Sequence, residues 1–374
     1  MAYDKNFYGK DGFIHFYGVV EDRLDPHKLG RLRVRCLGHH TDDKITLPTE
    51  DLPWAMCVMA TSEGGISGLG QSPSFIVEGT WVFGYFRDGE DMQEPVILGV
   101  LPGHPIEYGN PEKGFYDPNP REDDSTKSVY PREINESDIN RLARNDMDEN
   151  GVETFPHATL TARRLARRTT IATADFNPIS AADGSTIEGS DGGLWDQLPI
   201  PYSTEYPYNH VFESESGHIR EYDDTPYHTR IHERHNTGTS YEIDHTGNKT
   251  ELIVANHYII TNGNRQAQID GHSDTTINGH HKLYINRDGG VNNHYDIQVG
   301  PNANINIQVD TGNINLVTTQ GKINVNAGGD YNVKVGGNYT LAVAGNKTET
   351  IEGSKTSNTT GAVIHRGKTI NLNP

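Results

Sequence analysis

The chain has 374 residues, of which 33% are hydrophobic and 40 are glycine, and its formal net charge at pH 7 is -19. That length allows two or three domains, but the hydrophobic content is low for a single large core, so we expect mainly extended structure. The charge argues against a broad nucleic-acid-binding surface, because it repels phosphate backbones at long range. No apolar run reaches the ~18 residues of a membrane span, and we expect neither an anchor nor a signal peptide.

Residues 1–104 contain short strand-like runs separated by glycine, proline and charged clusters. The runs lie in FIHFYGVVEDRLDPHKLGRLRVRCLG, which holds two, and in LPWAMCVMA, VEGTWVFGYFRD and EPVILGVL. Five strands within about ninety residues predict a small closed barrel, of which the OB-fold is the commonest kind. We expect the aromatic residues Trp54, Trp81, Phe83 and Phe86 to lie in its core rather than to form a base-stacking platform.

The chain has two cysteines, Cys36 and Cys57, and both lie in strand-like segments. A protein made in a reducing cytoplasm keeps its thiols reduced, so we expect two buried free thiols rather than a disulfide.

Residues 105–205 are rich in proline, glycine and acidic side chains, which is typical of an extended linker. One segment, HATLTARRLARR, predicts a short helix near residues 157–168. Arg163, Arg164, Arg167 and Arg168 would line one side of it. They would either clamp an acidic patch on a partner or form a solvated face, and the sequence leaves both open.

A glycine recurs every eight residues from Gly321 to Gly361. With the glycine last, the units read KINVNAGG, DYNVKVGG, NYTLAVAG, NKTETIEG and SKTSNTTG, and the frame also appears earlier as NRQAQIDG and HSDTTING. Positions two, four and six are mostly apolar and share one face of a short strand. The glycine and the polar residue after it suit a turn. Each unit, called an octad below, therefore predicts one strand and one corner.

A single octad strand buries only a narrow face, so the units must stack. A single-chain solenoid usually shows six-residue rungs or calcium-binding nine-residue repeats, and this frame shows neither. We therefore expect three chains wrapped together, each giving strands to all three sides of a prism. Between Gly279 and Gly321 the register slips while the alternation continues, which predicts strands with bulges or a lengthened corner.

The 18 histidines do not form a clear metal-binding motif. HERH, at residues 232–235, lacks the HExxH spacing, and neighbours such as His39 and His40 would point to opposite faces of a strand. His365 would meet its copies at the axis of a trimer, but with one imidazole per chain, followed by Arg366, a metal there stays an open question. We predict no catalytic, cofactor-binding or metal-ligating residues.

Several segments resemble the N-terminal OB-fold domain of the central spike proteins of T-even-like contractile-tailed phages, namely GVVEDRLDPHKLGRLRVRCLGHH, LPTEDLPWAMCVMA, GGISGLGQSP and VEGTWVFGYFRDG. GFYDPNPREDDSTKSVYPRE looks like the linker after that domain. YPYNHVFESESGHIREYDDTP and HNTGTSYEIDHTGN, within residues 206–248, look like the entry to its triple-stranded β-helix. The resemblance covers most of the chain, and these blocks in this order form a highly specific set.

The resemblance implies a homotrimeric needle in the tail baseplate of a virion made in the host cytoplasm. In this family the OB domain docks on the baseplate hub, and sheath contraction drives the β-helix through the host outer membrane. We expect no nucleic-acid partner, because of the negative net charge, and no cofactor. Whether a separate tip protein binds at the C-terminus cannot be read from the sequence.

The chain departs from the best-known member of this family, which has a lysozyme domain between barrel and β-helix. Residues 105–205 are too short for that domain. Their carboxylates have no apolar pocket that would raise the pKa of one and leave the other ionised, as glycoside hydrolysis requires. We therefore expect a structural protein and not an enzyme.

The sequence thus predicts an all-β protein with an OB-fold domain at residues 1–104, an extended linker at 105–205 and an intertwined triple-stranded β-helix at 206–374. The alternative function is a receptor-binding or polysaccharide-degrading trimeric tailspike, which would need a groove lined by aromatic residues and paired carboxylates along the repeats. A third hypothesis, an OB-type nucleic-acid binder, is disfavoured by the charge.

Overall fold

The computed structural model divides into two units, Met1–His281 and Lys282–Pro374, and each is considered separately. It describes residues 13–107, 109–116, 137–145, 202–215, 218–235, 237, 239–253, 255–277, 279–286 and 293–370. In this part of the chain helix is limited to α1 (Arg141–Arg144) and the 3-10 turns η1 (Thr49–Asp51) and η2 (Gly89–Asp91). No helix among these residues is long and apolar enough to cross a bilayer. The described part of the chain is therefore almost free of helix, and its regular structure is nearly all β, as predicted.

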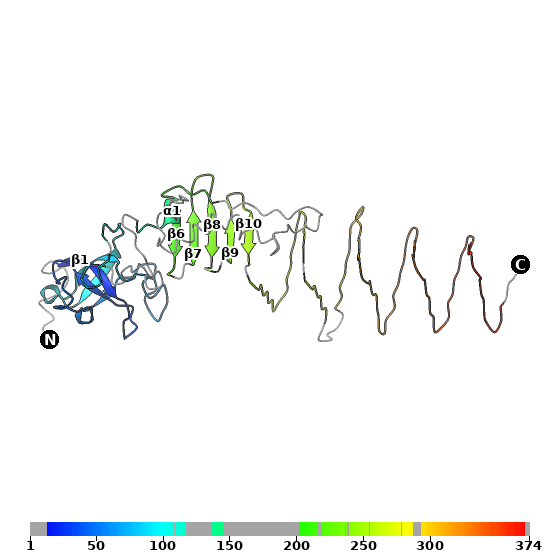
Figure 1. Ribbon diagram of the computed structural model, residues 1–374, viewed down its shortest axis with the longest axis horizontal. Coiled ribbons are helices and arrows are strands. Elements are labelled where there is room, and N and C mark those ends of the chain that lie inside the picture. The colour runs from blue at the N-terminus through cyan, green and yellow to red at the C-terminus, as the bar shows by residue number, and fades with distance from the viewer. Residues whose placement is uncertain are drawn as a thin grey trace. The chain divides into compact units, whose positions relative to one another are not determined.

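The first unit begins with a closed five-stranded barrel, which confirms the predicted architecture (Figure 1). Its strands are β1 (His15–Asp22), β2 (Leu32–Cys36), β3 (Trp54–Cys57), β4 (Trp81–Phe86) and β5 (Pro95–Val100). They close in the order β1-β2-β3-β5-β4, and the neighbours are antiparallel except for β3 and β5, which are parallel. A small five-stranded barrel of this kind is an OB-type barrel.

The barrel core is built by the alternation of inward and outward side chains along each strand. In β4, Val82, Gly84 and Phe86 point inward. Gly84 is required there, because a Cβ would lie 2.2 Å from the carbonyl oxygen of Val96 and 2.5 Å from the ring of Phe16. The buried core residues are Phe16, Val20, Leu32, Val34, Cys36, Ala55, Val82, Phe86 and Ile97.

The prediction for the barrel aromatics is right for one residue and wrong for three. Phe86 is in the core, but Trp54, Trp81 and Phe83 are only half-buried. The reason is strand parity, since Trp81 and Phe83 alternate with the inward-facing residues of β4, and Trp54 alternates with the buried Ala55 in β3.

An ion pair lies inside the barrel domain, where Arg35 Nε is 2.6 Å from Glu21 Oε1 and both side chains are fully buried. Arg35 also donates to two carbonyls of the loop after β2, at 2.7 and 2.8 Å. Gly114 packs on this arginine so closely that a Cβ would lie 2.2 Å from Arg35 Cδ. The Gly114 N–H donates to the Asp42 carbonyl at 2.7 Å. Residues beyond the last strand therefore fold back on the barrel.

A second sheet in the first unit is a five-stranded antiparallel meander, drawn side by side in Figure 1. Its strands are β6 (Asn209–Glu213), β7 (Ile219–Asp223), β8 (Arg230–Arg234), β9 (Ser240–Ile243) and β10 (Lys249–Leu252). The β9–β10 turn is held by Asp244, whose Oδ1 accepts hydrogen bonds from the N–H groups of Thr246 and Asn248. Gly247 has a φ of 87° in this turn, which favours glycine.

Helix α1 was not predicted, and the predicted helix near residues 157–168 lies outside the described residues, together with Arg163, Arg164, Arg167 and Arg168. Asn140 caps α1 by accepting a hydrogen bond from the Leu142 N–H at 2.9 Å. Asn145 ends the helix with a φ of 53°. Four residues are too few to give a helical hydrophobic period, so only the cap could have signalled this element.

In the second unit, residues 293–370 form extended segments that reverse direction repeatedly and contain no strand paired within the chain (Figure 1). Bends fall at residues 328–329, 336–337, 344–345, 352–353 and 360–361, which are the glycine corners of the octads or directly adjoin them. The predicted corners are therefore confirmed. Residues 255–277 of the first unit are extended and unpaired in the same way.

Candidate functional site

The register of the β6–β10 sheet determines which side chains share each of its two faces. Residues directly opposite each other in an antiparallel pair point to the same side. The pairs Glu221↔His232 and His232↔Glu242 therefore place three charged or polar groups in one row. We call this side the polar face; its polar residues are Asn209, Glu221, Asp223, Arg230, His232 and Glu242. The other side, the open face, carries Phe212, Tyr222, Ile231, Tyr241 and Ile243 together with charged residues that include Arg220, Glu233 and Glu251.

A buried network of charged groups occupies the centre of the polar face. Glu221 Oε2 lies 2.6 Å from His232 Nδ1, and Glu221 Oε1 lies 2.9 Å from Arg230 Nη2. Arg230 Nη1 lies 2.7 Å from Glu242 Oε2. Asn209 Nδ2 donates to Glu221 Oε1 at 3.2 Å. The side chains of Glu221 and Arg230 are 0% exposed, so these contacts are not screened by solvent.

Arg230 remains charged in this environment. Burial alone would lower the pKa of its guanidinium, but Glu221 and Glu242 together raise the pKa above its ordinary value. The guanidinium also lies over the ring of Tyr202, with 5.0 Å between Cζ and the ring centroid. A buried cation held by two carboxylates and an aromatic ring fixes the positions of three strands relative to one another.

The polar face is covered by two segments of the same chain, residues 140–145 and 202–205. The hydroxyl of Tyr202 and the amide of Asn209 both donate to the Leu142 carbonyl, at 2.8 and 3.2 Å. Leu142 is buried and packs with Ile219. Asn140 Nδ2 donates to Glu213 Oε2 at 2.7 Å. Residues 140–145 and 202–205, which are far apart in the sequence, therefore meet on the same face of the sheet.

The open face has less cover among the described residues: the ring of Phe75 contacts Phe212, with 4.9 Å between the ring centroids. Tyr222 and Ile231, on the inner strands β7 and β8, are 48% and 38% exposed, and Phe212, on the edge strand β6, is 42% exposed. Large apolar side chains on a continuous sheet face indicate an interaction surface rather than a solvated one.

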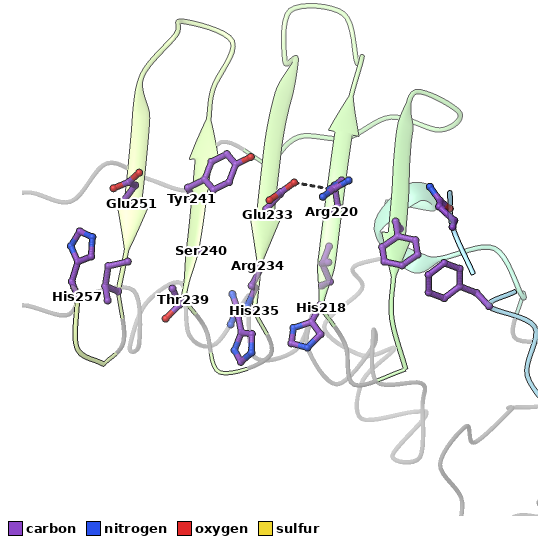
Figure 2. A pocket seen from close by; sticks show the side chains of 15 residues that line it. His218, Arg220, Glu233, Arg234, His235, Thr239, Ser240, Tyr241, Glu251 and His257 are labelled. Carbon is purple, nitrogen blue, oxygen red and sulfur yellow. Dashed lines mark ion pairs between the residues drawn. The ribbon is translucent and has the colours of Figure 1, made fainter. Parts of the chain in front are cut away.

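A groove of about 660 Å³ runs along the open face at the strand ends, and its side chains are shown in Figure 2. Arg220 Nε and Glu233 Oε1 form an ion pair of 2.6 Å across it. The rings of His218 and His235 lie 4.4 Å apart between centroids and are tilted by 42° to each other. The remaining labelled lining residues are Arg234, Thr239, Ser240, Tyr241, Glu251 and His257. Because Arg220 neutralises Glu233, these groups form a polar margin to the open face rather than an acid–base pair.

The octads show the same exposure of apolar side chains in a more extreme form. Tyr331, Val333 and Val335, at positions two, four and six of one octad, are 70%, 57% and 45% exposed. In the barrel, Val34 and Val82 are 0% exposed. The alternation predicted from the sequence is thus present, but in the described octads a single chain does not bury the apolar face.

The outer surface of the barrel carries a row of aromatic rings on β1 and β4. Tyr17 and Phe83 lie 5.3 Å apart between ring centroids, and His15 lies 6.1 Å from Phe83. Phe13 and Tyr85 continue the row at 5.7 Å. Phe13 and Tyr17 are about half exposed, so this row, here called the aromatic row, is a second candidate interaction surface.

Both cysteines predicted to be free thiols are free. Cys36 is buried in the barrel core, and burial raises the pKa of its thiol far above the ordinary value. Cys57 is only half-buried; burial raises the pKa of its thiol too, while its Sγ lies 3.7 Å from Ser74 Oγ. Neither thiol is activated as a nucleophile.

The histidine predictions had mixed outcomes. His39 and His40 lie in a turn after β2, not in a strand, and the Nδ1 of His40 accepts a hydrogen bond from the Cys36 N–H at 2.9 Å. His365 is exposed in an extended segment. Within the described part of a single chain, no group of three histidine, cysteine or acidic side chains could hold a metal ion. A metal shared between three copies of His365 stays an open question.

The buried network was missed by the sequence reasoning. HERH was examined only for zinc spacing, whereas His232 pairs with Glu221 and Arg230 closes the network. The usable signal was alternation, since residues 230, 232 and 234 share one face of β8 and are all charged or titratable.

Comparisons with known proteins agree with this architecture. The family model described as the Gp5 N-terminal OB domain matches residues 38–182, and the model of the Gp5 C-terminal repeat matches three copies within residues 329–357. Protein Gp5 of Vibrio phage KVP40 is 38% identical over 300 residues, covering 74% of this chain. The pre-baseplate central spike protein Gp5 of Enterobacteria phage T4 is 40% identical over 124 residues, covering 32% of this chain.

These alignments span 66% of the KVP40 protein and 20% of the T4 protein. The two family models match different ends of the chain, one over the barrel and linker and one over the octads. The chain therefore belongs to the Gp5 family and carries that family's OB domain and C-terminal repeat in this order.

Proposed function

We propose that this chain is the central spike of a contractile phage tail, located in the baseplate of the virion. In this proposal the barrel docks on the baseplate hub and the octads form the needle that pierces the host outer membrane on sheath contraction. The observation that carries the proposal is the unburied apolar row of the octads, attached in one chain to a self-contained OB barrel. The name of the T4 relative, a pre-baseplate central spike protein, points the same way.

The spike is a homotrimer in this proposal. The octads between residues 322 and 345 expose three alternate apolar positions each, and their extended backbone is not paired within the described chain; both are satisfied if neighbouring copies supply strands. Interwoven strands also suit a needle, since every strand edge is used by a neighbouring chain and the rod then resists bending and shear. Three copies would build the prism predicted from the eight-residue period.

Docking on the hub is assigned to the aromatic row of the barrel. Aromatic side chains bury large areas with few rotatable bonds, which is why they are enriched at protein interfaces. The net charge of -19 makes a nucleic acid an unsuitable ligand for this surface. A hub protein with an apolar docking surface fits it better.

The proposed action is mechanical and not catalytic. This rests on the length and composition of residues 105–205, which are too short for a lysozyme domain, and on the ion pairing of Glu233 in the groove of Figure 2. Cleavage of the cell wall would then belong to another protein of the tail.

The first test is the mass of the purified protein by light scattering, before and after mild heating in detergent. Three chains of 41.4 kDa give about 124 kDa, and an interwoven trimer resists dissociation. A species of single-chain mass would contradict the trimer and the needle mechanism together.

The second test measures hub docking with the hub protein of the same phage, by co-purification of the two proteins. Replacing Tyr17 and Phe83 by serine should abolish co-purification while the trimer mass is unchanged. Replacing exposed Leu24, which lies after β1 and is 81% exposed, by serine is the matched control. The alternative of a polysaccharide-degrading tailspike predicts turnover of host polysaccharide by the purified trimer, which the spike proposal does not.

A further inference from the structure

The apolar row of the octads is interrupted by a short polar stretch near its end. At positions two, four and six, the octads from residue 322 to 345 carry aliphatic or aromatic side chains, as in Tyr339, Leu341 and Val343. At the same positions, the next two octads carry Lys347, Glu349, Ile351, Lys355, Ser357 and Thr359. Val363, the next residue of this series, is apolar again. The face that the proposed trimer buries therefore contains a polar stretch between two apolar layers, here called the polar compartment.

The charged groups of the polar compartment meet within one chain. Glu349 Oε2 lies 2.8 Å from Lys355 Nζ and 3.2 Å from Lys347 Nζ. Glu349 and Lys355 belong to neighbouring octads, with the bend at residues 352–353 between them. Their contact across this bend shows that the two side chains point to the same side. Hydrogen bonds from Lys355 and then from Lys347 lower the pKa of the Glu349 carboxyl, so this group is ionised at neutral pH.

The charges of the polar compartment do not balance. Each chain supplies two lysines, and Glu349 is the one carboxylate at positions two, four and six between residues 322 and 365. Three copies bring together six ammonium groups and three carboxylates, which leaves three positive charges uncompensated. An unpaired charge enclosed away from water is costly, so either the lysines lose protons or a counter-ion is bound.

A bound oxyanion suits this set of side chains better than proton loss. Glu349 lies within 3.2 Å of both ammonium groups, and a carboxylate at that distance favours the charged form of lysine. Each ammonium has three N–H donors, and the hydroxyl of Ser357, two residues after Lys355 on the same face, adds another donor. Such donors bind phosphate and sulfate through charge-assisted hydrogen bonds. A tetrahedral oxyanion on a threefold axis can accept the same contacts from each copy.

We propose that the polar compartment is an anion site, in which Lys347, Lys355 and Ser357 of three copies enclose a tetrahedral inorganic oxyanion, phosphate or sulfate, on the axis of the needle. This rests on the homotrimer of the proposed function and adds a buried ligand to it. The anion offsets the excess positive charge and links the three chains where apolar contact between them is interrupted.

The direct test measures the anions that the unmodified trimer retains. The protein is transferred by gel filtration to a buffer free of phosphate, sulfate and chloride, unfolded with heat and urea, and analysed by ion chromatography. We expect about one phosphate or sulfate per trimer, since the trimer has one axis. Chloride alone, or no retained anion, in a protein of trimer mass overturns the anion site and leaves the spike proposal standing. A protein of single-chain mass overturns both.

A pair of matched lysine variants tests which side chains hold the anion. Lys355→Met leaves Lys347 and Glu349 in equal numbers, so this variant should retain about tenfold less oxyanion per trimer. Lys334→Met is the control, because position five of an octad lies on the other side of the strand, and this variant should retain the anion. Equal retention by the two variants contradicts the proposal. If Lys355→Met does not assemble, the anion content of the unmodified trimer decides the question.

Discussion

The barrel and the octads bury their apolar residues in opposite ways, although both are built from short alternating strands. In the barrel, Val34 and Val82 are 0% exposed because the sheet closes on itself and every strand has two neighbours. In the octads, Val333 and Leu341 are both 57% exposed, and the extended segments have no partner strand in the described chain. The same period-two pattern can therefore specify a domain that buries its own apolar side chains or a segment that leaves them exposed in a single chain.

The β6–β10 sheet stands between these extremes. Its strands are paired within the chain, as in the barrel, yet one of its faces is open, as in the octads. Substitutions in the barrel, in the sheet and in the octads should therefore affect stability in different ways.

Breaking the barrel core should have the largest effect and should not depend on assembly. Phe16→Ala removes a buried ring and should destabilise the barrel by about 3–5 kcal/mol, independently of protein concentration. Val333→Ala should instead lower a melting temperature that varies with protein concentration. Thermal unfolding at several concentrations measures both, and a concentration-independent effect of Val333→Ala would count against burial between chains.

Breaking the buried network of the sheet should cost nearly as much. Arg230→Met leaves Glu221 and Glu242 without their shared cation, and breaking a buried pair costs about 3–5 kcal/mol. The control is Arg220→Met on the same pair of strands, whose partner is Glu233 and whose side chain is 56% exposed. An exposed pair contributes at most about 1 kcal/mol. Denaturant unfolding measures the free energy of unfolding of both variants. Equal losses would mean that burial does not determine how much an ion pair contributes to stability.

Adding a side chain at Gly114, which packs on Arg35, should have an intermediate effect on the stability of the barrel. A methyl group at Gly114 would overlap Arg35 Cδ, so Gly114→Ala should cost about 1–3 kcal/mol and loosen residues 109–116 from the barrel. Gly103→Ala is the control, because its Cβ would meet nothing within 4 Å. Limited proteolysis together with thermal unfolding would detect the difference, and identical behaviour of the two variants would contradict this packing.

The smallest effect concerns pH. Hydrogen bonds from Arg31, and then from the N–H groups of His27 and Leu29, hold the pKa of Asp25 well below its ordinary value. A lowered pKa gives stability that is present above the unfolded pKa of about 3.9 and is lost as the pH falls toward the folded value. Asp25→Asn should therefore flatten the decline in barrel melting temperature below about pH 4. If the melting temperature of this variant falls below pH 4 as steeply as that of the unmodified protein, other carboxylates control the loss of stability in acid.

Much of the fold follows from local patterns that one sequence displays. Alternation and turn residues were enough to predict the barrel strands and the eight-residue corners, because strands and glycine turns obey rules that act over a few residues. The open face and the buried network could not be predicted in this way. They depend on pairing between β7, β8 and β9, which brings Glu221, His232 and Glu242 into one row across the sheet.

The sequence by itself determined that this protein is built from short strands and where the repeating units turn. It also determined that a single unit cannot bury its own apolar positions. Only the tertiary structure decided which barrel aromatics point outward, that α1 and Tyr202 close the polar face, and that a charged network lies beneath them. The physical reason is the sequence range of the interactions. Strand period and turn geometry are set by neighbours along the chain, whereas burial and ion pairing are set by residues that meet only after the strands have chosen their partners.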